Sequence, residues 1–165
     1  MTYIVDSCCF MKPFRVTYPM DIAESFWNKV AELANNHKFY SIDKVKKEIF
    51  ENSDELTSWC KAKLPQDFFI STETEEFYVK FGEIVTWAQN RNIKQMGIDK
   101  FIDADKADIY IVTMAALAPE IYTVVTEETS APKSQTAIKL PDACSAFNIR
   151  CINFIEMLRE LAAKF

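Results

Sequence analysis

Acidic residues directly follow two apolar, β-favouring segments of this chain. Tyr3-Ile4-Val5 is followed by Asp6, and the β-branched segment 121–126 is followed by Glu127 and Glu128. Both segments predict buried strands of a parallel sheet. The carboxyl ends of parallel strands meet at one edge of a sheet, where a ligand crevice forms, so we expect Asp6 and Glu127 to lie close together. The ordinary alternative for Asp6 is that it caps the following turn.

Two further carboxylates belong to predicted helices. Glu48 lies beside the apolar face of a helix that Ser41 is expected to cap, and Asp108 opens an almost wholly apolar helix. If both residues face the same sheet edge, at least four carboxylates converge there without an Arg or His spaced to pair with each. Their repulsion is costly unless a cation is bound, and oxygen ligands favour Mg²⁺ or Mn²⁺ over zinc. The alternative for an aspartate near Asp108 is that it complements the helix dipole.

The elements that must position these residues alternate between strands and helices. The apolar pattern predicts strands at residues 3–5, 38–40, 68–70, 121–126 and 150–152, a loop at 8–19, and helices at 21–35, 42–49, 54–64, 72–88, 93–101, 109–118, 141–147 and 154–164. Capping boxes are expected at Thr72 with Glu75 and at Asn153 with Glu156. This alternation predicts an α/β protein, a three-layer α/β/α sandwich with a central parallel sheet and the first strand in the middle. We expect one domain over residues 1–165.

Composition excludes several classes of protein. With only 2 Gly among 165 residues, neither a dinucleotide-binding fingerprint nor a Walker A loop can be written. The net charge of −5 argues against a broad basic surface for nucleic acid. Five cysteines without a CxxC pair indicate reduced thiols, and the single His37 excludes a multi-histidine zinc site. We expect a cytoplasmic protein, since no signal peptide precedes Asp6 and no apolar stretch is long enough to span a membrane.

Several of these motifs, in this order, resemble one known family. They are Asp6-Ser7 after the first strand, Val45-Lys46-Lys47-Glu48-Ile49, Ala107 to Val112, Val124 to Glu128, and Ile138 to Cys144. Together they are similar to the PIN domain of VapC-type ribonucleases, and more closely to PIN-like proteins described as VapC-like or PilT N-terminal-like. The resemblance covers nearly the whole chain and implies a PIN-like fold.

The resemblance implies a metal-dependent endoribonuclease that is the toxin of a toxin–antitoxin pair. In that family, acidic residues hold Mg²⁺ or Mn²⁺ and activate water for hydrolysis of the RNA phosphodiester. The residues that match the catalytic and metal-binding acids are Asp6, Glu48, Asp108 and Glu127. Ser7 stands where the family usually has a Thr hydroxyl, and Cys8 stands where Asn is frequent. The implied partners are an RNA substrate, an antitoxin protein and a second copy of the chain, with no membrane.

Five other residues are candidates from their position alone. Asp105 precedes Asp108 by three residues, so on a continuous helix the two share a face and Asp105 is an additional metal ligand. Lys12, Arg15, Lys133 and Lys139 lie in predicted loops at the acidic edge and are candidates for holding substrate phosphates, and Ser7 is a further candidate for binding the substrate.

A second hypothesis from a different class stays open. A catalytically idle PIN-like fold can serve as a protein- or RNA-binding module. The joint presence of Asp6, Glu48, Asp108 and Glu127 favours the enzyme, because an idle scaffold has no reason to keep carboxylates whose repulsion is costly.

Overall fold

The computed structural model describes residues 2–165, and its centre is a five-stranded parallel sheet. The strands are β1 (Thr2–Val5), β2 (Phe39–Ile42), β3 (Phe69–Ile70), β4 (Tyr122–Val125) and β5 (Arg150–Ile152). Their order is β3-β2-β1-β4-β5, so β1 is central, as predicted. In the register, Ile4 lies opposite Tyr40 on one side and Val124 on the other.

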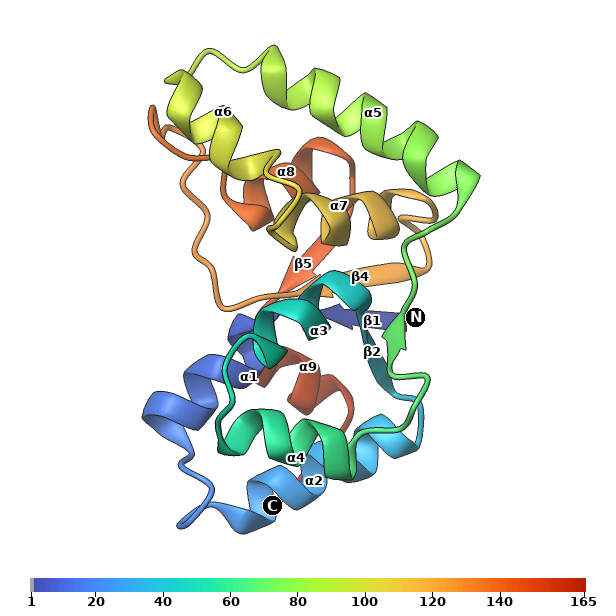
Figure 1. Cartoon of the computed structure of the whole chain (residues 1–165), viewed down its shortest axis with the longest axis vertical. Helices are drawn as coiled ribbons and strands as arrows, with labels where there is room; N and C mark the ends of the chain where they lie inside the picture. Colours follow the sequence, from blue (N-terminus) through green and yellow to red (C-terminus); the bar gives the residue numbers. More distant parts are fainter. Residues whose placement is uncertain (1) are drawn as a thin grey trace.

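Helices cover both faces of this sheet, which confirms the predicted α/β sandwich with a parallel sheet (Figure 1). They are α1 (Cys8–Lys12), the π-helical η1 (Pro13–Thr17), α2 (Glu24–Asn35), α3 (Asp43–Phe50), α4 (Glu55–Lys63), α5 (Glu75–Gln89), α6 (Gln95–Phe101), α7 (Asp108–Ala116), α8 (Leu140–Ala146) and α9 (Phe154–Glu160). In Figure 1, α5, α6, α7 and α8 lie on one side of the sheet, and α2, α4 and α9 lie on the other.

Aromatic and apolar side chains fill the two interfaces between the helices and the sheet. On one side, the ring of Phe10 packs edge-on against Phe68 and tilted against Phe39 and Phe154. On the other side, α7 is buried nearly all round, as its composition predicts, and Tyr110 stacks on Phe77 of α5. No helix within residues 2–165 is long and apolar enough to span a bilayer.

The segment after Asp6 differs from the predicted loop. Residues 8–17 form α1 and η1, and Cys9, Phe10 and Pro13 are buried there. A proline is compatible with the first turn of a helical segment, because its missing N–H has no intrahelical acceptor there. Lys12 and Arg15 therefore extend from helical backbone.

Two of the predicted helix caps are wrong. Ser41 belongs to β2, where its hydroxyl donates to the carbonyl oxygen of Val5 at 2.6 Å. Helix α5 is capped by Thr74, which accepts from the N–H of Phe77, whereas Thr72 donates to the carboxylate of Asp43. In both cases a tertiary partner competes successfully for the hydroxyl.

At the carboxyl end of the chain the predicted capping box is confirmed. The Asn153 side chain accepts from the N–H of Glu156, and the Glu156 carboxylate accepts from the N–H of Asn153, both at 2.9 Å. Helix α9 ends at Glu160, earlier than predicted, and Ile155 on it is exposed.

Candidate active site

Asp6 lies at the carboxyl end of the central strand and is only 5% exposed. Its Oδ2 accepts from the Thr126 hydroxyl at 2.9 Å and from the Cys8 thiol at 2.7 Å. The Ser7 hydroxyl lies 3.3 Å from Oδ1. Thr126 comes into reach because β1 and β4 are neighbours in register, which brings the residues after Val5 and Val125 side by side. Burial, and then the adjacent Cys8 thiol, raises the pKa of Asp6 well above its usual value.

Glu48 links the end of β1 to the start of α7. Its Oε2 accepts from the Ser7 hydroxyl at 2.7 Å, and its Oε1 accepts from the N–H of Ala107 at 2.9 Å. This carboxylate therefore fixes helix α3 against the first turn of α7. The predicted convergence of Asp6 and Glu48 follows from these contacts, since Ser7 donates to both.

Asp108 is the first residue of α7 and lies beside these acids. Burial raises the pKa of its carboxyl to about 7, with further contributions from the charges of Asp6, Glu128 and Glu48. Lys139 acts in the opposite direction. Among the described residues, no hydrogen-bond donor reaches the Asp108 carboxylate, in contrast to those of Asp6 and Glu48. Asp108 is thus a half-buried carboxylate among acidic groups with no donor of its own.

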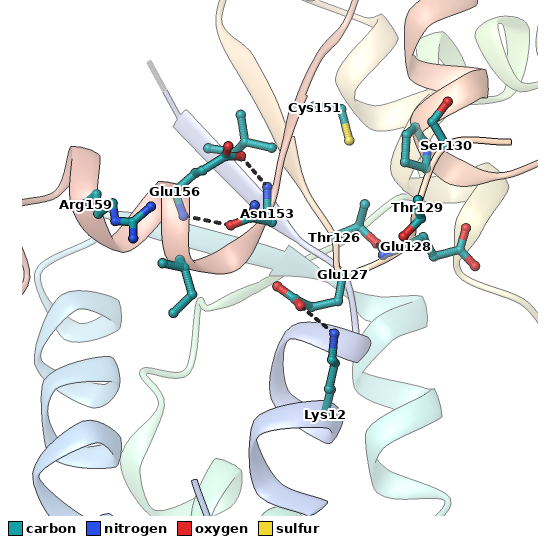
Figure 2. Close-up of a pocket in the computed structure, with 13 residues that line it drawn as sticks. Lys12, Thr126, Glu127, Glu128, Thr129, Ser130, Cys151, Asn153, Glu156 and Arg159 are labelled. Carbon is teal, nitrogen blue, oxygen red and sulfur yellow. Dashed lines mark hydrogen bonds and ion pairs between the residues drawn. The ribbon is translucent and has the colours of Figure 1, made fainter. Parts of the chain in front are cut away.

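The two glutamates after β4 face different surroundings. Glu127 pairs with Lys12 at 2.9 Å and accepts from the N–H of Phe154 at 3.1 Å, so it holds α1 and the start of α9 together. Glu128 accepts from the N–H of Leu140 at 3.0 Å and pairs with Lys139 at 3.3 Å. Figure 2 shows their side chains directed to opposite sides of the backbone. Glu128 is therefore the acid that faces Asp108, in place of the predicted Glu127.

Of the other predicted residues, Asp105 and Arg15 lie apart from the acids, whereas Ser7 and Lys12 contact them. Asp105 is exposed and pairs with Lys47 at 2.7 Å. It does not share a helix face with Asp108, because α7 begins only at Asp108 and residues 103–106 form a turn. Arg15 is exposed on η1. Lys12 neutralises Glu127 rather than standing free for a substrate.

Thr126 is a part of this site that the predictions did not include, and the contacts of Cys8 and Lys139 there were not predicted. The Cys8 thiol also lies 3.3 Å from the Thr126 hydroxyl and accepts from the N–H of Glu127 at 3.1 Å. The sequence does contain a signal for Thr126. It is the first polar residue after the buried part of its strand, as Asp6 is after β1, and the ends of neighbouring parallel strands lie side by side. Lys139, a candidate for holding substrate phosphates, instead pairs with Glu128 at 3.3 Å.

These oxygen atoms are of the type that Mg²⁺ and Mn²⁺ prefer. As they lie, however, no three His, Cys, Asp or Glu side chains within residues 2–165 are placed to hold one ion together. A cation at this site requires a rotation of side chains, and Asp108 is the one that no hydrogen bond holds in place.

A cleft of 570 Å³ adjoins the acids on the Glu127 side of the chain. Figure 2 shows Lys12 and Arg159 on its walls, with the hydroxyls of Thr129 and Ser130. The cleft begins at the carboxyl ends of β4 and β5, where open α/β sheets bind ligands.

The fold and these contacts define a parallel α/β protein with a cluster of carboxylates at the carboxyl edge of its sheet. The chain belongs to the DUF4411 family, a domain of unknown function, whose sequence model matches residues 3–165. No curated protein matches the chain.

Proposed function

We propose that this chain is a PIN-like, Mg²⁺- or Mn²⁺-dependent endoribonuclease. The observation that supports it best is the Asp108 carboxylate, which is half-buried, lacks a donor and lies beside Asp6, Glu48 and Glu128. A carboxylate that gains nothing from hydrogen bonding and is repelled by its neighbours costs free energy in the metal-free protein. A bound cation would offset this repulsion and so account for the presence of the carboxylate cluster.

The residues fit such an ion by their chemistry. Asp6, Glu48, Asp108 and Glu128 supply only oxygen ligands, and no hydrogen bond among the described residues holds the Asp108 carboxylate. When bound, the metal would supply Lewis-acid polarisation of the scissile phosphate and a lowered pKa for the attacking water. Glu128 replaces Glu127 in this assignment, because Glu128 lies at the same pocket as Asp108 and acts on its carboxyl, whereas Glu127 does not.

The chain's own groups have separate roles in this proposal. Ser7 and Thr126 donate to Asp6 and so hold its carboxylate in one orientation. Glu48 keeps the first turn of α7, and with it Asp108, next to the end of β1. The adjoining cleft has room for nucleotides that flank the scissile bond. A role as a toxin, with an antitoxin partner and a homodimeric state, rests on the family resemblance alone.

The neighbouring glutamates after β4 provide a matched test. We expect Glu128→Gln and Asp108→Asn each to weaken Mn²⁺ binding, measured by calorimetry, and RNA cleavage by about 10–100-fold. Glu127→Gln should leave Mn²⁺ affinity within about twofold, although it removes the charge that pairs with Lys12. Cleavage should be measured on a panel that includes structured transfer RNAs, with EDTA as the metal-free control. Equal Mn²⁺ affinity in the Glu127 and Glu128 variants would contradict the assignment.

An idle binding module is the second candidate, and specific contacts favour it. Both oxygens of Asp6 and both oxygens of Glu48 already accept hydrogen bonds, and Lys139 partly neutralises Glu128. A cluster satisfied in this way needs no ion. If calorimetry detects no Mg²⁺ or Mn²⁺ binding and no RNA is cut, this candidate replaces the nuclease.

A further inference from the structure

A second pocket lies between α3, α4 and β3 and shares no residue with the acidic site. Its volume is 330 Å³. The rings of Phe50 and Phe69, in edge contact with centroids 6.1 Å apart, form part of its wall together with Leu64 and Pro65. Buried Cys60 also lines it, and burial raises the pKa of this thiol to about 12, so the thiol stays neutral. The pocket is therefore apolar over much of its lining.

Two lysines at this pocket carry charge that the protein does not neutralise. The ammonium of Lys46 lies 5.6 Å from the centre of the Phe50 ring, and that of Lys61 lies 5.2 Å from it. Throughout the described part of the chain, neither lysine has a carboxylate within ion-pair distance, whereas Lys12, Lys47 and Lys139 each do. The chain has 24 acidic and 19 basic residues, so a local pair of unneutralised lysines runs against its overall charge.

We propose that this pocket binds a small organic anion, with an apolar ring against Phe50 and Phe69 and its anionic group held by Lys46 and Lys61. The volume lies at the lower end of the range for small-molecule sites, about 300–1,000 Å³, which favours a compact ligand over a segment of another protein. A carboxylate, a sulfonate and a phosphate share the chemistry that two ammonium groups recognise. The site is independent of the nuclease proposal, because Asp6 and its neighbours take no part in it.

The test uses anilinonaphthalene sulfonate, a fluorescent ring system with one anionic group, and the neutral phenylnaphthylamine that lacks the sulfonate. We expect saturable binding of the sulfonate at one site per chain. Lys46→Gln and Lys61→Gln should each weaken it about threefold, and the double variant about tenfold, as for exposed ion pairs. Binding of the neutral probe should change less than twofold in these variants. Lys38→Gln, an exposed lysine away from the pocket, is the matched control.

A second variant tests the pocket without changing charge. Leu64→Trp fills the space and should remove binding of both probes, with circular dichroism and the melting temperature confirming that it folds. Competition by inorganic phosphate would identify a phosphate as the anionic group, whereas competition by benzoate alone would identify a carboxylate. Equal sulfonate binding by the unaltered protein and the double lysine variant would overturn the proposal, as would the absence of saturable binding.

Discussion

At the scale of single residues, the Asp108 carboxylate decides how the site behaves. Asp108 is the first residue of a buried helix, and no hydrogen-bond donor among the described residues reaches its carboxylate. Its pKa is raised to about 7, mainly by burial. A raised pKa in the folded state means that the native protein binds a proton more tightly than the unfolded chain. The free energy of unfolding therefore falls as pH rises from about 4 toward 7, and the full cost is present above the folded-state pKa.

We expect Asp108→Asn to remove this cost. At pH 8 and without metal, the variant should be more stable than the unaltered protein by about 1–3 kcal/mol. This is less than the free energy equivalent to the whole pKa shift of Asp108, because Asp6 titrates in the same cluster and shares the effect. At pH 4 the two should be equally stable within about 0.5 kcal/mol. Urea unfolding at pH 4, 6 and 8 measures the difference.

Asp105→Asn is the matched control for this prediction. Asp105 is exposed, and its hydrogen bond and ion pair with Lys47 lower the pKa of its carboxyl. A lowered pKa stabilises the native state above the ordinary pKa, and this contribution is lost as pH falls, so the control variant gains no stability at pH 8. A gain in both variants would mean that general acidic repulsion, rather than the position of Asp108, is responsible.

At the scale of elements, α6 packs closely against the 129–139 loop, which ends at Lys139. The N–H of Lys94 donates to the carbonyl oxygen of Gln135 at 2.8 Å. A Cβ on Gly97 would lie 2.5 Å from the carbonyl oxygen of Thr136, so only glycine allows this close approach. Helix α6 runs through Gly97 without interruption.

Gly97→Ala should therefore separate α6 from the loop. We expect a loss of about 1–3 kcal/mol in the free energy of unfolding, the usual cost of overpacking against backbone. Gly82→Ala is the control, because a Cβ there meets no atom within 4 Å and a helical alanine is favoured. Denaturant midpoints of the two variants give the comparison, and a stable Gly97→Ala protein would show that the loop moves freely.

At the scale of the whole molecule, the acids join β1, α3, α7 and the segment after β4. Each comes from a separate part of the chain, so an ion held among them would stabilise the native state alone. At a Mn²⁺ concentration about 100 times the Kd, mass action adds about 2.7 kcal/mol. For a chain of this size that corresponds to a rise of roughly 5–10 °C in melting temperature.

Calorimetric scans with Mn²⁺ and with EDTA measure this rise. We expect it to be lost in Asp108→Asn and kept in Asp105→Asn, whose side chain lies outside the cluster. An equal rise in both variants would place the ion elsewhere on this acidic protein.

The sequence by itself determined the layers of the fold and the edge at which the acids gather. Alternation of β-branched segments with helical periods is a local property of the chain, and a parallel sheet with β1 central follows from it. The capping box of Asn153 and Glu156 is equally local, since each partner lies within one turn of the other.

Only the tertiary structure decided which neighbouring side chains face the site. Consecutive residues of extended backbone point to opposite sides, so the choice between Glu127 and Glu128 depends on a register of one residue that pattern alone does not define. Asp105 was misplaced because the start of α7 is set by packing and by Glu48, not by the acidic run. The hydroxyl of Ser41 donates to Val5, and that of Thr72 donates to Asp43. Both acceptors are distant in sequence, so only the folded chain brings them to these hydroxyls.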